Sequence, residues 1–156
     1  MDCRARLESL FRARGVSFDV QEHPTAFTAQ TVAASEHVPG RMFAKVVMAL
    51  ANGELVMLVL PAPSMVDVSK LGAVFGGKQI RLASEEDFAG AFPDCEPGAM
   101  PPFGNEYGVP VYADRTLGNI ERIVFQAGSH NLSMSVAYAD FERLAEPTVA
   151  DIAVLR

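Results

Sequence analysis

The sequence has no tryptophan, only two cysteines and only three histidines among its 156 residues. Cys3 and Cys95 are too few for a disulfide framework and form no Cys-x-x-Cys motif, so a reducing compartment is the simplest expectation. His23, His37 and His130 lie far apart and show none of the close spacings typical of zinc sites. These scarce residues give no reason to expect a metal or a cofactor.

Long apolar runs and an excess of basic charge are also missing. The longest runs, Val46–Ala51 and Leu55–Ala62, are far shorter than the ~20 residues that span a bilayer, and the first residues lack the apolar stretch of a signal peptide. We therefore expect a soluble, cytoplasmic protein without membrane contacts. The net charge of −6 argues against broad binding to DNA or other nucleic acids, which requires many phosphate contacts. Recognition of one short single-stranded end remains compatible with it.

The composition is that of an ordinary globular protein, with 49% hydrophobic and 21% charged residues. The pattern predicts one domain over residues 1–156, with a mixed α/β fold in which helices surround a curved, largely antiparallel mixed sheet. Helices are expected over Cys3–Arg14, Thr28–His37, Asp67–Phe75, Ser84–Phe92 and Asp140–Leu144. Strands are expected over Val16–Val20, Met42–Leu50, Glu54–Leu60, Gln79–Leu82, Val109–Ala113, Glu121–Ala127, Leu132–Ala137 and, as one last extended segment, Val149–Leu155. Asn52-Gly53 predicts a central hairpin that is covered on both faces.

Lys45 stands out because it interrupts the apolar run Phe43–Leu50. Removing an ammonium group from water is unfavourable, so a lysine in such a run usually opens into a cleft or meets an anionic partner. The alternative is an edge strand, on which a lysine prevents association between sheets. The spacing alone does not choose between these two interpretations.

The segment from Pro93 to Gly108 is rich in proline and glycine and has no periodicity, which predicts a long ordered loop. Within it, Pro101 and Pro102 fix their own φ angles, while Gly98 permits a turn that other residues resist. Such a loop can hold several backbone N–H groups toward one point, where they would stabilise a carbonyl oxygen as it becomes an oxyanion. A rigid connector is the plainer interpretation.

Other catalytic and ligand-binding motifs are incomplete or absent. Gly72–Lys78 has the glycine and lysine spacing of a phosphate-binding loop, but Gln79 replaces the required serine or threonine and a strand follows instead of a helix. No Gly-x-Ser-x-Gly elbow is present, and Cys95 has no histidine near it in the sequence, so a partly buried thiol is the better interpretation.

Four segments, taken in order, resemble one known family. They are His23-Pro24 with Phe27-Thr28, Val38-Pro39-Gly40 leading to Phe43-Ala44-Lys45, Gly98-x-x-x-Pro102-Phe103-Gly104, and Ala127-Gly128-Ser129-His130. Together they resemble the YbaK/ProXp family of aminoacyl-tRNA deacylases, which includes the editing domain inserted in bacterial prolyl-tRNA synthetases. The resemblance extends from about His23 to Leu144.

The resemblance implies trans-editing, which is hydrolysis of the ester between a mischarged amino acid and the terminal adenosine of a tRNA, without a metal. The amino acid would be small, such as Ala, Cys, Ser or Thr. By the resemblance Lys45 helps to place the tRNA 3′ end, and the backbone amides of Gly98–Pro102 hold the aminoacyl carbonyl. Substrate groups such as the ribose hydroxyl would position the attacking water. Possible partners are the mischarged tRNA 3′ end and an aminoacyl-tRNA synthetase.

The loop interior departs from the pattern of other members, which carry small or hydroxylated residues where this chain has Ala99-Met100-Pro101. Because the pocket selects the amino acid, its identity stays open. The substrate-binding residues that we expect are Phe27, Thr28, Phe43, Ala99, Met100, Pro101, Gly128, Ser129 and His130.

Two other functions remain open at this stage. One is a catalytically silent module of the same fold that binds tRNA ends or a synthetase, because no general base is obvious. The other is a metal hydrolase that uses scattered histidines and glutamates.

Overall fold

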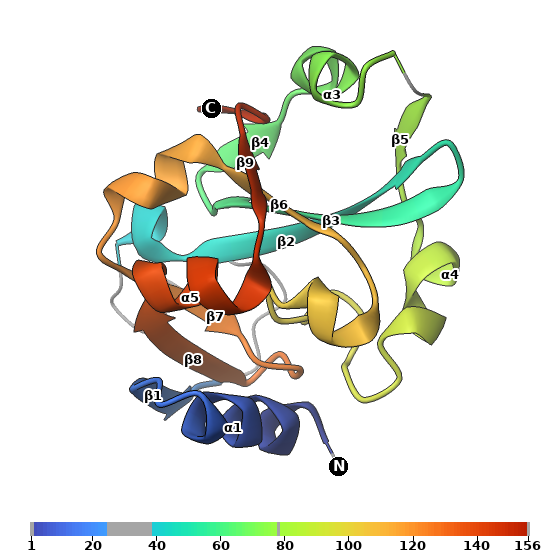
Figure 1. Cartoon of the computed structure of the whole chain (residues 1–156). Coiled ribbons are helices and arrows are strands. Elements are labelled where there is room, and N and C mark those ends of the chain that lie inside the picture. The colour runs from blue at the N-terminus through green and yellow to red at the C-terminus, as the bar shows by residue number, and fades with distance from the viewer. Residues whose placement is uncertain (1, 25–38, 78, 156) are drawn as a thin grey trace.

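The computed structural model describes residues 2–24, 39–77 and 79–155, in which short helices surround curved sheets (Figure 1). Within these residues the helices are α1 (Cys3–Ala13), α3 (Val68–Val74), α4 (Glu85–Phe88) and α5 (Tyr138–Ala145). Short 3-10 turns are η1 (Gly40–Met42), η2 (Ala89–Ala91), η3 (Gly104–Tyr107) and η4 (Arg115–Asn119). The strands are β1 (Phe18–Glu22), β2 (Ala44–Ala51), β3 (Glu54–Pro61), β4 (Ser64–Val66), β5 (Ile80–Leu82), β6 (Val111–Asp114), β7 (Arg122–Gln126), β8 (Leu132–Ala137), β9 (Thr148–Ala150) and β10 (Ala153–Leu155).

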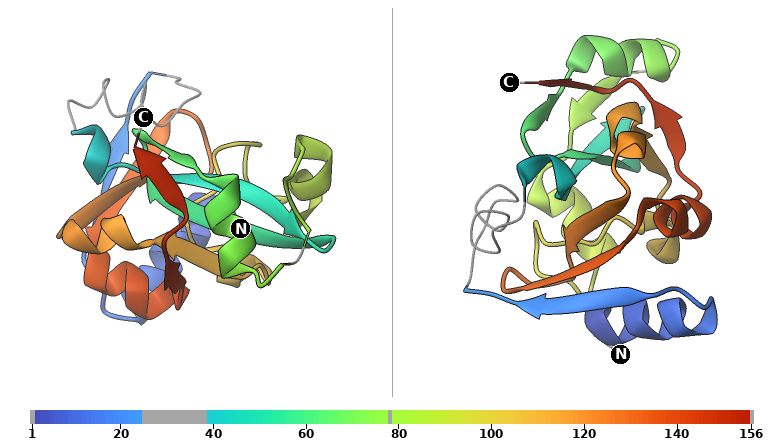
Figure 2. Two further views of the ribbon diagram at one scale, coloured as in Figure 1. Left: turned by 90° about the horizontal axis from the view of Figure 1, so that it is seen from above. Right: turned by 90° about the vertical axis from the view of Figure 1, so that its left-hand side faces the viewer.

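The strands form a five-stranded sheet in the order β5-β2-β3-β6-β9, a three-stranded sheet β1-β8-β7 and a small pair β10-β4. Among the strands of the described residues, β3–β6 and β6–β9 are the only parallel pairs. An isolated parallel bridge between Phe43 and Val124 connects the two larger sheets. In Figure 1 the β1-β8-β7 sheet and α1 lie below the β2–β3 hairpin and α3 lies above it, and the right-hand view of Figure 2 repeats this order. The predicted mixed α/β fold with a largely antiparallel sheet is confirmed.

The β2–β3 hairpin is central, as predicted. Asn52 and Gly53 both have positive φ angles, 50° and 83°, which is the backbone of the tight turn that matches the twist of two strands. Alternate residues then face two different cores. Met48 and Met57 belong to the larger core, whereas Ala49 and Leu58 belong to the smaller one below α3. The hairpin is therefore covered on both faces.

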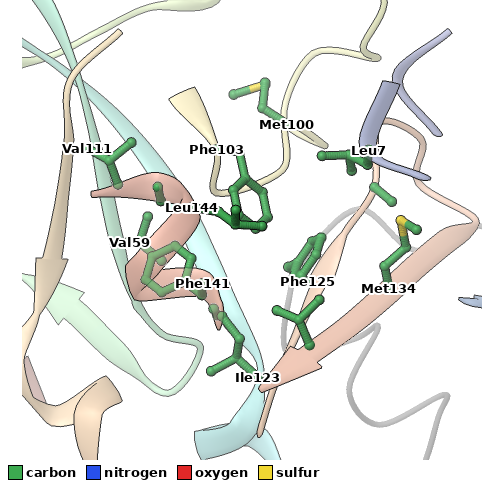
Figure 3. Close-up of a cluster of buried hydrophobic side chains, with 14 of the residues drawn as sticks. Leu7, Val59, Met100, Phe103, Val111, Ile123, Phe125, Met134, Phe141 and Leu144 are labelled. Atoms are coloured by element: carbon green, nitrogen blue, oxygen red, sulfur yellow. The ribbon is translucent and has the colours of Figure 1, made fainter. Parts of the chain in front are cut away.

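Phe103 anchors the proline-rich loop in the larger core, and its side chain is completely buried. Its ring makes edge-to-face contacts with Phe11, Phe125 and Phe141 at centroid distances of 5.6, 5.5 and 5.8 Å. Figure 3 shows Phe103 between Phe125 and the α5 residues Phe141 and Leu144. Because the ring is surrounded on several sides, the loop is held in place although its only regular element is the short turn η3.

Most predicted elements are present within a few residues of their expected bounds, but the C-terminal segment is not one strand. It divides at Asp151-Ile152 into β9, which pairs with β6, and β10, which pairs with β4. The strand β4 was not predicted, because three residues are too few to show a pattern. The helix expected over Thr28–His37 falls outside the described residues.

Asp114 causes the division. Its carboxylate is 1% exposed, and one oxygen accepts the N–H groups of Ile152 and Ala153 at 3.0 and 3.1 Å. The other oxygen accepts the backbone N–H of Thr116 at 3.1 Å and also bonds the Thr116 hydroxyl. The chain turns at residues 152–153 because these two N–H groups point to a buried carboxylate and not to a strand.

Asp114→Asn is expected to lower the free energy of unfolding by about 2 kcal/mol, because the amide keeps one acceptor oxygen and turns an NH₂ group toward backbone donors. Urea denaturation measures the loss. Asp87→Asn is the matched control, since Asp87 also accepts from the backbone and hydroxyl of Ser84, at 2.8 and 2.9 Å, but on the surface. Equal losses in the two variants would contradict the role given to burial.

Candidate functional site

The first half of the proline-rich loop is hydrogen-bonded to the turn between β7 and β8. The N–H of Gly128 donates to the carbonyl of Ala99 at 2.9 Å, and the N–H of Glu96 donates to the carbonyl of Gly128 at 2.8 Å. The Glu96 carboxylate then accepts the backbone N–H of His130 at 2.8 Å. Residues about 30 positions apart in the chain are thus joined by three hydrogen bonds.

The His130 ring lies against this loop and is 8% exposed. Its Nε2 is 2.9 Å from the carbonyl oxygen of Pro97. Because a carbonyl oxygen only accepts, Nε2 carries the proton in this contact. A Cβ placed on Gly98 would lie 3.5 Å from Cε1 of the ring. The imidazole and the Gly98 backbone therefore form one surface.

Gly98 has a φ angle of +87°, which only glycine adopts without strain. Its N–H points to the Sδ of Met100 at 3.2 Å, whereas the N–H of Ala99 donates to the carbonyl of Glu96 at 3.0 Å. A thioether is a weak acceptor. The Gly98 N–H therefore has only a weak acceptor, and a carbonyl oxygen would be a stronger partner for it if the Met100 side chain moved.

Met100 lies behind the loop. Its side chain is 4% exposed and belongs to the larger core, and Figure 3 shows it above Phe103 and Leu7. Ala99, Pro101 and Pro102 are buried as well. Of the residues Gly98–Pro102, only Gly98 is exposed, so the loop presents backbone to its surroundings more than side chains.

Lys45 lies on β2 opposite Leu60 of β3 and is half-buried. The strand β2 lies between β5 and β3 in its sheet. However, β5 pairs only with Ala49–Ala51, so Lys45 lies where β2 has left β5 and approaches β7 through the Phe43–Val124 bridge. Phe43 itself is fully buried at this junction.

The two strands run in the same direction at that bridge. Because side chains alternate along a strand, the next residue on the same face is Lys45 on β2 and Gln126 on β7. Gln126 pairs with Ser133 on β8, and Ser133 pairs with Gln21 on β1. Lys45 thus continues a polar row across the β1-β8-β7 sheet, in which Gln126 and Ser133 are buried at 8% and 1% exposure.

The structure thus brings Gly98 and Ala99 together with Gly128, Ser129 and His130. It places Lys45 near the start of β2, beside β7, which is the strand that leads to Gly128. Phe27 and Thr28 fall outside the described residues. Sequence reasoning missed Glu96, Gln126 and Ser133. The alternation of serine with apolar residues along Leu132–Ala137 was the available signal for Ser133.

An ionic group supports the loop from behind. The carboxylate of Asp94 accepts from Arg6 Nε at 3.0 Å and from the hydroxyl of Tyr107 at 2.7 Å. The Arg6 guanidinium also stacks over the Tyr107 ring, 4.6 Å from its centroid. Burial raises the pKa of Asp94, but the hydrogen bonds from Tyr107 and Arg6 outweigh it and hold the pKa below its usual value. Both ends of the loop are therefore tied to α1.

Gly128→Ala is expected to destabilise the protein by about 2 kcal/mol. Gly128 has a φ of +96°, and a Cβ there would overlap the Cβ of Cys3 and lie 2.6 Å from its Sγ. Thermal unfolding measures the change. Gly15→Ala is the control, because Gly15 has a φ of +69° with nothing within 4 Å of an added Cβ. Similar losses in both variants would show that α1 moves aside freely.

No group of three or more His, Cys, Asp or Glu side chains suited to a metal ion exists among the described residues. None of the described helices is long and apolar enough to cross a membrane.

Comparisons with known proteins identify the family to which this fold is related. The model of the aminoacyl-tRNA editing domain matches residues 23–144. The multifunctional Ser/Thr-tRNA deacylase ProXp-y of Escherichia coli K12 is 27% identical over 151 residues, which cover 94% of this chain and 90% of that protein. A proline–tRNA ligase of Thiobacillus denitrificans is 31% identical over 134 residues, which are 84% of this chain and 23% of the ligase. A crystal structure of a proposed trans-editing enzyme for prolyl-tRNA synthetase superposes with a TM-score of 0.85 at 18% identity, covering 99% of this chain and 98% of that one.

Proposed function

Because this chain belongs to the aminoacyl-tRNA editing domain family, in its YbaK/ProXp group, we propose that it is a trans-editing deacylase acting on mischarged tRNA. The reaction is hydrolysis of the ester that joins the amino acid to the 3′-terminal ribose. The amino acid would be small, among Ala, Cys, Ser and Thr, and the whole of residues 1–156 would act as one domain. The Ser/Thr-tRNA deacylase activity in the name of the Escherichia coli relative supports Ser and Thr as the first candidates.

The observation that carries the proposal is the exposed Gly98 backbone, locked by the Glu96, Gly128 and His130 contacts and held only by a thioether at its N–H. An ester carbonyl oxygen would receive this N–H once the Met100 side chain has moved aside, because the donor points to the buried sulfur when no substrate is bound. As water attacks and the oxygen becomes anionic, that hydrogen bond strengthens, so the site favours the transition state over the ground state.

Lys45 would bind the phosphate of the terminal nucleotide, since a lysine ammonium is a point charge suited to phosphate. The attacking water would be positioned by the ribose hydroxyl of the substrate. An aminoacyl ester is activated, so orientation and oxyanion stabilisation suffice without a protein base. The acidic chain, with its net charge of −6, would gain tRNA affinity by docking to an aminoacyl-tRNA synthetase.

Deacylation of purified Ser-, Thr-, Ala- and Cys-charged tRNAs, with and without a chelator, tests the proposal. We expect release of at least one of these amino acids at a rate that the chelator does not change. Tight binding of charged tRNA without release would support the silent binding module instead, and loss of activity with the chelator would support a metal hydrolase.

A further inference from the structure

The two cysteines of the chain lie side by side although 91 residues separate them, since Cys3 begins α1 and Cys95 precedes the Gly98–Pro102 loop. Each thiol is the largest single influence on the pKa of the other, so the two groups interact directly. Both border one cavity of about 590 Å³, whose lining includes Glu96, Pro97 and Gly128. Cys3 is 3% exposed, whereas Cys95 is half-buried. A small oxidant can therefore reach the pair from the Cys95 side.

Polar groups surround the two sulfur atoms. Cys95 Sγ lies 3.5 Å from a carboxylate oxygen of Asp94 and 3.5 Å from the Tyr107 hydroxyl. The Asp94 carboxylate also forms an ion pair with Arg6. The hydrogen bond from Cys95 lowers the pKa of Cys3, against the effect of burial. The same contact and burial raise the pKa of Cys95. The two neighbouring thiols therefore differ in acidity, and in such a pair the more acidic cysteine attacks an oxidant and the other resolves the product.

We propose that Cys3 and Cys95 are a redox-active dithiol, which a peroxide converts to an intramolecular disulfide. The Cys3 thiolate attacks one peroxide oxygen, the O–O bond breaks, and a sulfenic acid forms with release of water. The Cys95 sulfur then attacks the Cys3 sulfur and displaces a second water, which takes up the Cys95 proton. Two thiols and one hydrogen peroxide thus give one disulfide and two waters, and a small thiol reductant such as glutathione restores the pair.

The proposal does not depend on the deacylase activity, but the disulfide would lie next to its site. It joins α1 to the segment that carries Glu96, whose carboxylate binds the backbone of His130. Cys3 also supports Gly128 directly. A covalent bond here closes a loop of more than ninety residues, which removes much conformational freedom from the unfolded chain.

The test exposes the reduced, folded chain to hydrogen peroxide, then unfolds it and labels the remaining thiols with an alkylating reagent before mass spectrometry. We expect a monomer that has lost two hydrogen atoms, takes up no label and yields one peptide linking Cys3 to Cys95. The formation rate should exceed that of the same chain in concentrated urea by about 10-fold or more, because folding holds the thiols in contact. The oxidised form should melt at least about 5 °C above the reduced form.

Cys3→Ser and Cys95→Ser are the controls, and neither should lose two hydrogen atoms. Full labelling of both cysteines after peroxide, oxygen addition to single cysteines, or disulfide-linked dimers alone would each overturn the proposal. So would a rate in urea equal to that of the folded chain, because the geometry of the fold would then contribute nothing.

Discussion

Lys45→Ala is expected to lower kcat/KM for deacylation by about 100-fold or more, while the melting temperature changes little. A charge-assisted contact to phosphate contributes to orienting the substrate as well as to binding it, and misplacement of a reacting group by about 1 Å alone reduces rates by about 100-fold. Lys45 is half-buried at the junction of β2 and β7, so its truncation removes little packing. Single-turnover deacylation of a mischarged tRNA measures the rate, and thermal unfolding checks the fold.

Lys70→Ala is the matched control for removing a lysine. Lys70 lies on α3, on the opposite side of the hairpin from the β1-β8-β7 sheet (Figure 1), and its ammonium bonds Asp151 at 2.9 Å. We expect this variant to deacylate like the unmodified protein. If Lys45→Ala retained more than half of the activity, or lost no more than Lys70→Ala, the site would not include Lys45.

The sequence predicted those parts of the fold that depend on neighbouring residues. The Asn52-Gly53 turn, the alternation along β8 and the Asp67 cap of α3 are all readable locally, because each rests on contacts within a few positions. The C-terminal segment could not be predicted in this way. Its division into β9 and β10 depends on the carboxylate of Asp114, which lies 38 positions earlier in the chain.

The same distinction applies to the candidate site. Gly98 and Lys45 are visible in the sequence because each is unusual in its own surroundings. The contacts that build the site are not visible in the sequence, because the hydrogen bond between Glu96 and His130 spans 34 positions. The core position of Met100 was also hidden, since nothing in the loop shows which side chains turn inward.

Gly98→Ala is the second large effect that we expect, a loss of about 100-fold or more in kcat/KM. The added methyl group has room, because its nearest contact is an ordinary 3.5 Å from the His130 ring. The substitution acts on the backbone instead, because a φ of +87° is strained for any residue with a Cβ. Relief of that strain rotates the Gly98 peptide and turns its N–H away from the position of the developing oxyanion, where loss of one donor costs about 100- to 1,000-fold.

Gly108→Ala separates this effect from strain in general. Gly108 ends η3 with a φ of +75°, and an added Cβ there meets nothing within 4 Å. Both variants therefore carry a similar backbone penalty, but only Gly98 lies beside His130 in the candidate site. We expect similar losses of melting temperature in the two variants and a loss of deacylation in Gly98→Ala alone. Equal activities would mean that the Gly98 N–H does not bind the carbonyl, and the thioether of Met100 would then be only its structural partner.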